Sequence, residues 1–207
     1  SDNVTSLGFN LNAMKRTASN VRERLSPEQW STINQCIENF QADCHKASTF
    51  HDFSSSLAID ALNRANGALS AITGAQADRM TRDDGWQLLS IGRHIERLAF
   101  LTNSLDSAIV SGLLSNPNAD SSGYTALLNL FDSTITFHAQ HQQSREIAPL
   151  ISLLVMDDEN PRSLAWVSKA LRARLSKLAG TERDNPDELT RSVTNLQDYD
   201  LYKLSTA

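Results

Sequence analysis

The chain is poor in glycine, proline and cysteine, and it contains no long apolar run. It has 8 glycines, 5 prolines and 2 cysteines among 207 residues. Because no stretch of about 18 consecutive apolar residues occurs, the sequence predicts no membrane-spanning helix. The first residues, SDNVTSLGFNLN, have no basic region followed by an apolar one, so no signal peptide is predicted. We therefore expect a cytoplasmic chain whose cysteines stay reduced.

Positive charge and metal-ligand patterns are also scarce. The net charge of −5 and the pI near 5.5 give no basic excess for phosphate contacts, so nucleic acid is not an expected partner. Cys36 and Cys44 lack the spacing of a zinc site or a disulfide framework. His138 and His141 lie three residues apart, but no Glu-x-x-His pair accompanies them, as a di-iron bundle requires. The sequence therefore predicts no metal and no cofactor.

Helical periodicity runs through the whole chain. Hydrophobic residues make up 40% of it and charged residues 21%, which is typical of a globular domain. Ser26-Pro27 and Asn160-Pro161 each place a capping residue before a first-turn proline, and Gln29 completes a capping box with Ser26. The sequence predicts an all-α fold with helices over about residues 6–25, 27–46, 50–74, 83–111, 123–142, 145–157, 161–179 and 186–204.

The short connections between these segments favour an antiparallel bundle of about eight helices. A chain of this length predicts one domain over residues 1–207. The polar tail 180–207 is expected to be a loosely packed C-terminal extension.

The predicted helix over 83–111 carries apolar residues on two sides. One continuous seam consists of Leu88, Ile91, Ile95, Leu98, Thr102, Leu105 and Ile109. The opposite side holds Trp86, Leu89, Arg93, Glu96, Arg97, Phe100 and Asn103. A helix that is apolar on both sides is usually buried inside a bundle, so we expect Arg93, Glu96 and Arg97 to be charges on a partly buried face.

Two guanidinium groups and one carboxylate leave this face with an excess positive charge, and a buried charge must be paired. Asp132, Asp157, Asp158 or a bound anion could complete the set. Two interpretations remain open. The charges could form a buried ion-pair network that fixes helix packing. Alternatively, arginine's fork geometry could hold a carboxylate or another anion.

The segment Asn160-Pro161-Arg162-Ser163 is expected to open the helix over 161–179. Asn160 suits the N-cap and Pro161 the first helical position. Arg162 would then oppose the helix dipole unless an acidic group or an anion compensates it. We therefore expect Arg162 to meet Glu96 in space, with Asp132 joining them.

Two blocks, MTRDDGWQLLSIGRHIERLAF at 80–100 and LLVMDDENPRSLAWVSKALRARL at 153–175, resemble the bacterial alpha-E domain, a helical domain named for its E-R motif. VRERLSPEQW at 21–30 resembles a third block of that family, and LFDSTITFHAQH at 130–141 a fourth. The resemblance assigns the E-R pair to Glu96 and Arg97. Its other motif residues are Gly85, Trp86, Asn160, Pro161, Arg162 and Ser163.

The chain departs from the family pattern in two respects. The family has an earlier helical portion, so the chain resembles the C-terminal two-thirds of the domain. Phe137 and His138 stand where members usually have tyrosine and arginine, so no role of those two residues is carried over.

The resemblance implies partners and leaves the reaction open. Alpha-E domains occur fused to, or encoded beside, circularly permuted ATP-grasp proteins and transglutaminase-like peptidases, in sets that resemble peptide ligation or modification systems. This chain has no glycine-rich phosphate loop, so ATP chemistry would belong to the partner. One hypothesis is a non-catalytic accessory or interaction module of such a system. The alternative is an enzyme or small-ligand-binding domain with an Arg/Glu-lined pocket for a carboxylate or phosphate.

Overall fold

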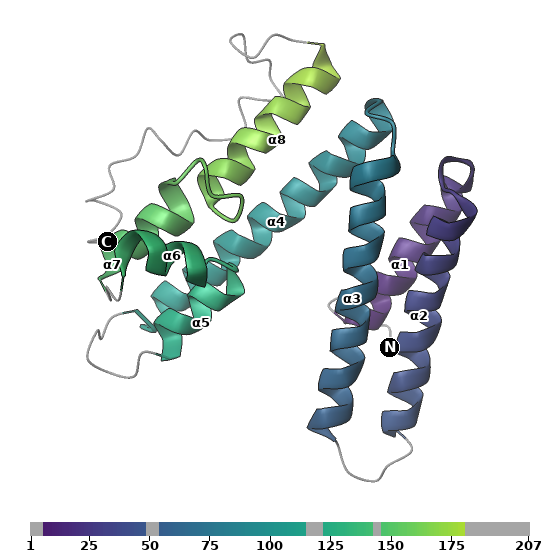
Figure 1. Ribbon diagram of the computed structural model, residues 1–207, viewed down its shortest axis with the longest axis horizontal. Helices are drawn as coiled ribbons and strands as arrows, with labels where there is room; N and C mark the ends of the chain where they lie inside the picture. The colour runs from purple at the N-terminus through teal and green to yellow at the C-terminus, as the bar shows by residue number, and fades with distance from the viewer. Residues whose placement is uncertain (1–5, 49–53, 115–121, 143–145, 181–207) are drawn as a thin grey trace. The chain divides into compact units, whose positions relative to one another are not determined.

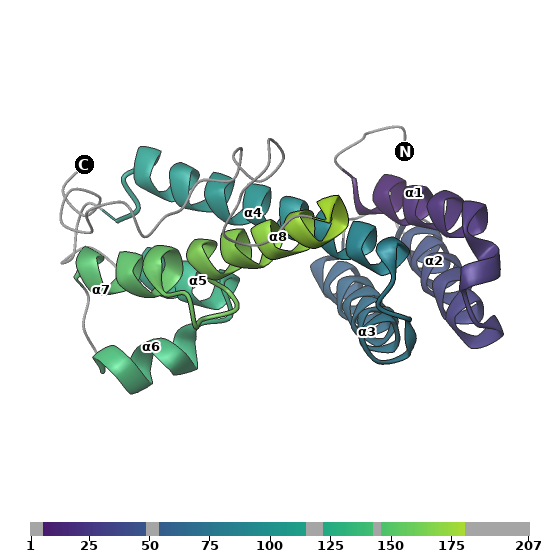
Figure 2. The same cartoon turned by 90° about the horizontal axis from the view of Figure 1, so that it is seen from above.

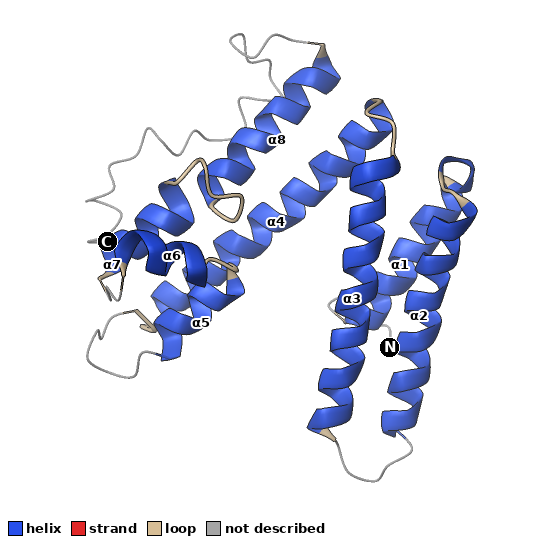
Figure 3. Ribbon diagram, in the orientation of Figure 1, coloured by secondary structure: helices blue, strands red, loops and turns tan. Residues whose placement is uncertain are grey.

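The structure, a computed structural model, describes residues 6–48, 54–114, 122–142 and 146–180. Within these ranges it contains eight α-helices and no strand, so the predicted all-α fold is confirmed (Figures 1 and 3). The chain divides between Thr81 and Arg82 into two compact units, each described below by itself. The single-domain expectation stays a prediction, and the predicted helix 186–204 lies outside the described residues. No described helix combines the length and apolarity that crossing a membrane requires.

The first unit is built from three long helices. Its elements are α1 (Leu7–Asn20), a short 3-10 turn (Arg22–Arg24), α2 (Pro27–Ser48) and α3 (Ser55–Arg79). α2 and α3 lie side by side, and α1 packs on α2 (Figures 1 and 2). Their core is formed by the buried side chains of Leu11, Ala18, Ile33, Cys36, Ile37 and Ile72. Ala61 and Ala65 on α3 are buried as well.

Helix starts in the first unit follow the capping signals of the sequence. The backbone N–H of Gln29 donates to Ser26 Oγ at 3.2 Å, and the backbone N–H of Ser26 donates to Gln29 Oε1 at 3.1 Å. This reciprocal pair is the predicted capping box, with Pro27 at the first helical position. Ser6 and Ser54 cap α1 and α3 with their own hydroxyl groups. Local chemistry therefore sets where these helices begin.

The second unit combines two long helices with several short ones. Its elements are α4 (Asp84–Val110), α5 (Ser122–Leu130), α6 (Thr134–His141), α7 (Ile147–Ile151), a π-helical turn (Ser152–Met156) and α8 (Leu164–Ala179). Arg174, late in α8, contacts Ser90, early in α4, whereas Trp166 at the start of α8 stacks on His94. α8 therefore runs antiparallel to α4.

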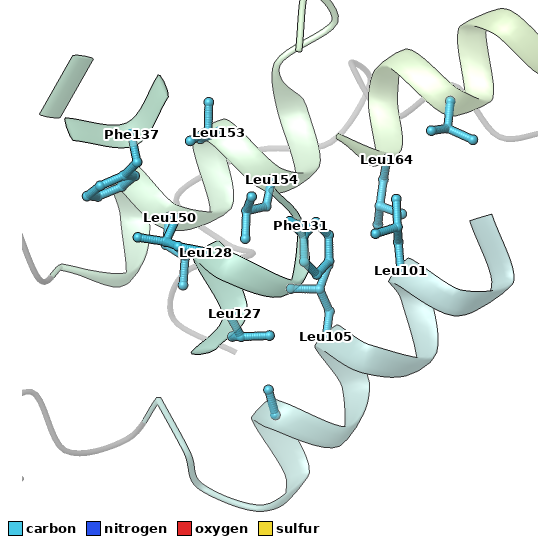
Figure 4. Packing of buried hydrophobic residues seen from close by; sticks show 12 residues of the cluster. Leu101, Leu105, Leu127, Leu128, Phe131, Phe137, Leu150, Leu153, Leu154 and Leu164 are labelled. Carbon is cyan, nitrogen blue, oxygen red and sulfur yellow. The ribbon is translucent and has the colours of Figure 1, made fainter. Parts of the chain in front are cut away.

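A leucine-rich core holds the second unit together (Figure 4). It joins α4 to α8 and to the short helices between them. Phe137 and Leu154 are fully buried at 0% exposure, and Phe131 is exposed by only 1%. Full burial of a side chain of this size stabilises a fold by about 1.5–3 kcal/mol.

The predicted helix over 123–142 is interrupted. α5 ends at Leu130 and α6 begins at Thr134, because Asp132 adopts a left-handed backbone conformation with φ of 50°. Aspartate tolerates this region better than most residues. Ser133 is fully buried, and its Oγ donates to the carbonyl of Phe131 at 3.0 Å. The break allows Phe131 and Phe137 to enter the same core.

The buried face of α4 differs from the predicted seam. The buried residues are Gln87, Ser90, Ile91, Leu101, Leu105 and Ala108. Leu88, Ile95 and Ile109 from the predicted seam are 57%, 51% and 54% exposed, so their assignment to the core is wrong. α8 packs on the side of α4 that carries Ser90 and Leu101, and polar side chains form part of that interface. Residue type alone did not reveal them.

Candidate functional site

The E-R pair lies in the middle of α4, with both side chains exposed and Arg93 half-buried. Glu96 forms no ion pair with any described residue. The prediction that Glu96 is buried and paired with Arg93 is therefore wrong. The physical reason is that α8 covers the side of α4 that carries Ser90. Glu96 lies roughly 120° away from Ser90 at about 100° per residue, outside the covered arc. The motif faces away from this interface.

The loop before α8 is built around Asn160, which is buried. Its side-chain amide donates to the carbonyl of Leu153 at 3.1 Å and to Ser133 Oγ at 3.4 Å, and its Oδ1 accepts the backbone N–H of Arg162 at 3.0 Å. Asn160 thereby fastens the loop to the turn between α5 and α6. Its predicted role as N-cap of the helix is wrong, because the helix starts four residues later.

Ser163 caps α8 instead. Its hydroxyl oxygen accepts the backbone N–H of Trp166 at 3.0 Å, and its O–H donates to the carbonyl of Asp157. Pro161 is exposed in the loop and does not occupy the first helical position. Arg162 likewise precedes the cap, so the expected conflict with the helix dipole does not arise inside the first turn.

Arg162 pairs with Asp132, as the sequence suggested it could. The Nη2–Oδ2 distance is 2.9 Å, and the side chains are 48% and 75% exposed, so the pair belongs to the surface and not to a buried centre. Asp157 and Asp158 have other partners. Asp157 accepts backbone N–H groups of its own loop, and Asp158 pairs with Lys169 at 2.6 Å. Asp132 is therefore the carboxylate that the structure places on Arg162.

Arg162 also acts on α4. Neighbouring groups partly shield the guanidinium of Arg97 from water, although its side chain is exposed, and this lowers its pKa; the positive charge of Arg162 lowers it further. Burial and the charge of Arg97 lower the pKa of Arg93 in turn. Arg97 makes no ion pair with a described carboxylate. Arg97 thus lies near enough to Arg93, and Arg162 near enough to Arg97, for their positive charges to interact, and Asp132 pairs with Arg162.

Gly85 and Trp86 open α4, where Asp83 caps the helix by accepting the Trp86 N–H at 3.1 Å. The guanidinium groups of Arg82 and Arg174 lie 4.1 and 4.5 Å from the Trp86 ring centroid. Cation–π contacts of this kind contribute about 0.5–2 kcal/mol each. Trp86 therefore fastens the start of α4 to the second half of α8.

Arg174 was not singled out from the sequence. It is half-buried, and its Nε donates to Ser90 Oγ at 3.3 Å. The only sequence signal is its position in the block 153–175. His94 was also left without a role. Burial lowers the pKa of His94, the bond to the Ser90 carbonyl opposes this, and the nearby arginines lower it further.

His138 and His141 of α6 contact residues that lie close to them in the sequence. His138 Nδ1 lies 2.7 Å from the carbonyl oxygen of Gln142, and both imidazole rings contact Phe137. Among the described residues, no three histidine, cysteine, aspartate or glutamate side chains gather as a metal-binding group.

Comparison with known proteins gives a family and distant relatives. The Alpha-E family, described as "A predicted alpha-helical domain with a conserved ER motif", matches residues 1–203. The chain is 25% identical over 192 residues to "Uncharacterized protein Rv2567" of Mycobacterium tuberculosis and to "Uncharacterized protein Mb2597" of Mycobacterium bovis. Each alignment covers 90% of this chain but 21% of the relative, so the chain spans about a fifth of their length. No solved structure matches the chain significantly.

Proposed function

The chain belongs to the Alpha-E family, and on this premise we propose that it is a non-catalytic accessory module that docks onto an ATP-grasp ligase domain. The surrounding system would be a bacterial peptide ligation or modification system, in which a transglutaminase-like peptidase also takes part. The motif resemblance described above is the source of these partners. The share of the family's domain that the chain represents stays a prediction.

The observation that carries this proposal is the exposure of the E-R motif. Charged residues needed only for packing would be expected in contact with other parts of their own fold. Glu96 instead has no ion-pair partner among the described residues, and the half-exposed apolar side chain of Phe100 lies one turn further along the same side of the helix. A surface that combines charged and apolar side chains suits a protein partner better than solvent alone.

The length of the relatives supports the same proposal. The aligned region is 21% of each mycobacterial protein, so this kind of helical domain occurs there as part of a much longer chain. A domain in that setting has neighbouring domains available for contact.

The proposal is tested by binding between purified components. The 207-residue chain would be titrated with the ATP-grasp domain encoded with it, by isothermal titration calorimetry, as wild type and as Glu96→Gln and Arg97→Gln. We expect each substitution to weaken binding about tenfold, as for a contact at the centre of an interface. Arg16→Gln, which removes an exposed positive charge from α1, is the matched control. Absence of binding by the wild-type chain, or equal affinity of all variants, would contradict the proposal.

A second candidate function is the binding of a carboxylate or phosphate by Arg93, Arg97 and Arg162. The observation that favours it is that burial, and then a neighbouring positive charge, lowers the pKa of Arg93 and of Arg97, and a bound anion would oppose the second cause. Titration with inorganic phosphate and with glutamate, followed by nuclear magnetic resonance, tests it. Saturable binding in roughly the millimolar range that Arg97→Gln abolishes would support it. Shifts that grow linearly with concentration would contradict it.

A further inference from the structure

The structure assigns a docking groove between α4 and α5, and we infer that it holds a peptide segment of the partner that is apolar along its length and acidic at one end. The inference rests on the proposed function, because it names the part of the partner that binds. It adds the place and the chemistry of the contact, neither of which the E-R motif supplies.

The groove follows the C-terminal half of α4 and has a volume of about 550 Å³. Phe100, Ser104 and Ser107 line it from α4, and Leu127 and Leu130 line it from α5, which lies beside α4 in Figure 1. Leu113, in the turn after α4, borders one end. Phe100, Leu113 and Leu130 are 51%, 48% and 50% exposed, so three large apolar side chains are offered to solvent in one hollow.

Small side chains on α4 create the hollow. The positions 93, 97, 100, 104, 107 and 111 recur every three or four residues and therefore share one side of the helix. The last three are serines, which leave space that larger residues would fill. Ser104 Oγ donates to the Phe100 carbonyl at 2.7 Å, and Ser111 Oγ to the Ala108 carbonyl at 3.3 Å. Because the helix itself accepts the hydroxyl hydrogens of Ser104 and Ser111, these two side chains offer fewer polar groups to the groove.

Positively charged side chains lie beyond the other end of the groove. Arg97 precedes Phe100 by one helical turn on the same side of α4. α5 leads from Leu130 into Asp132, which pairs with Arg162, and Arg162 is near enough to lower the pKa of Arg97. A segment lying in the groove would thus meet apolar side chains first and then guanidinium groups.

The bound segment must match both the apolar groove and the arginine side chains at its end. Apolar side chains spaced by three or four residues would fill the space beside Phe100 and Leu130, and a carboxylate at the end would reach Arg97. A second copy of this chain fits less well, because the residues that line the groove include no carboxylate that could reach Arg97 of the other copy. The longer relatives, of which four fifths lie outside the alignment, contain the additional chain from which such a segment would come.

Two fluorescein-labelled synthetic peptides test the inference on the 207-residue chain by fluorescence polarisation. Both peptides carry leucine at helical spacing, and one has glutamate where the other has lysine. We expect the glutamate peptide alone to bind, and salt to weaken its binding. Phe100→Ser and Leu130→Ser should each weaken it about tenfold. Ser104→Trp, which fills the groove, should abolish binding.

Ile95→Ser is the matched control, because Ile95 lies on α4 outside the groove and is exposed to the same 51% as Phe100. It should bind like wild type, and circular dichroism should show every variant folded. Equal binding of both peptides, no binding of either, or equal losses at Ile95 and Phe100 would overturn the inference. Self-association of the chain that Phe100→Ser abolishes would overturn it in favour of a second copy.

The outcome is separable from that of the proposed function. If the ATP-grasp domain binds and Phe100→Ser leaves that binding unchanged, the groove inference fails while the docking proposal stands. If the domain does not bind but the glutamate peptide does, with loss in Phe100→Ser, the docking proposal fails while the groove stands.

Discussion

The two units use polar side chains in different ways. In the first unit, helix starts rest on contacts within four residues, as in the capping box of Ser26 and Gln29, and the long-range contacts Gln41–Asn12 and Arg64–Asp43 are exposed. In the second unit polar groups act over long separations and below the surface, as where Asn160 bonds to Ser133 and Arg174 to Ser90. The first unit therefore relies on helix starts and an apolar core, whereas the second also contains buried or part-buried polar contacts between distant segments.

Three of the family motifs lie in the unit that contains such contacts. The Gly-Trp pair, the E-R pair and the Asn-Pro-Arg-Ser loop all belong to the second unit. The side chains of Asn160, Ser163 and Trp86 make internal contacts that hold this unit together. Glu96 and Arg97, in contrast, form no ion pair with a described carboxylate or cation, and their side chains are exposed.

The largest expected effect concerns the core of the second unit. Phe137→Ala removes a fully buried ring and should lower the free energy of unfolding by about 3–5 kcal/mol, measured by urea denaturation. Ile135→Ala, two residues away and 88% exposed, should change it by less than about 0.5 kcal/mol. A loss below about 1 kcal/mol for Phe137→Ala would show that this core is not packed as described.

Next is the buried amide that distinguishes the second unit. Asn160→Ala removes hydrogen bonds to Leu153 and Ser133 and leaves a buried carbonyl without its donor, so we expect a loss of about 2–3 kcal/mol by the same method. Asn103→Ala, at an exposed position of α4, is the control. If both variants unfold at the wild-type urea concentration, the long-range polar contacts do not support this unit and the comparison fails.

A smaller loss of stability is expected when the capping box of the first unit is disrupted. Ser26→Ala removes the N-cap of α2 and should cost about 1 kcal/mol, less than Asn160→Ala. Ser19→Ala on exposed α1 surface provides the baseline. The reverse order, with Ser26→Ala the more damaging of the two, would mean that local capping matters more than the buried loop.

The smallest effect is a pH dependence in the second unit. The pKa of His94 is lowered by burial, so the unfolded chain binds this proton more readily than the folded chain. Stability should therefore fall as the pH drops through and below about 6.5, the usual range of histidine. His94→Gln should lose less stability over that window than wild type. Identical pH profiles for wild type and His94→Gln would contradict this.

The sequence predicted the helical class and most helix starts because capping and periodicity are local signals. Ser26, Pro27 and Gln29 lie where the capping box requires, and α2 follows. The break at Asp132 was not predicted, because it depends on Phe131 and Phe137 sharing a core that later segments complete.

The candidate site was predicted in part. The Asp132–Arg162 pair was anticipated from charge alone, and the structure contains it. The burial of Glu96 was not correct, because the face of α4 that becomes covered is decided by α8, whose contacts include the polar residues Ser90 and His94. A count of apolar residues cannot reveal a polar interface of this kind.

The most direct test of a motif that serves a partner is the pair of measurements on Glu96→Ala. The account predicts a change of less than about 0.5 kcal/mol in the free energy of unfolding, because the side chain is exposed and unpaired among the described residues. It also predicts about tenfold weaker binding to the ATP-grasp domain. A loss of about 3–5 kcal/mol in stability with unchanged binding would instead identify a buried pair that holds the fold, and would contradict the account.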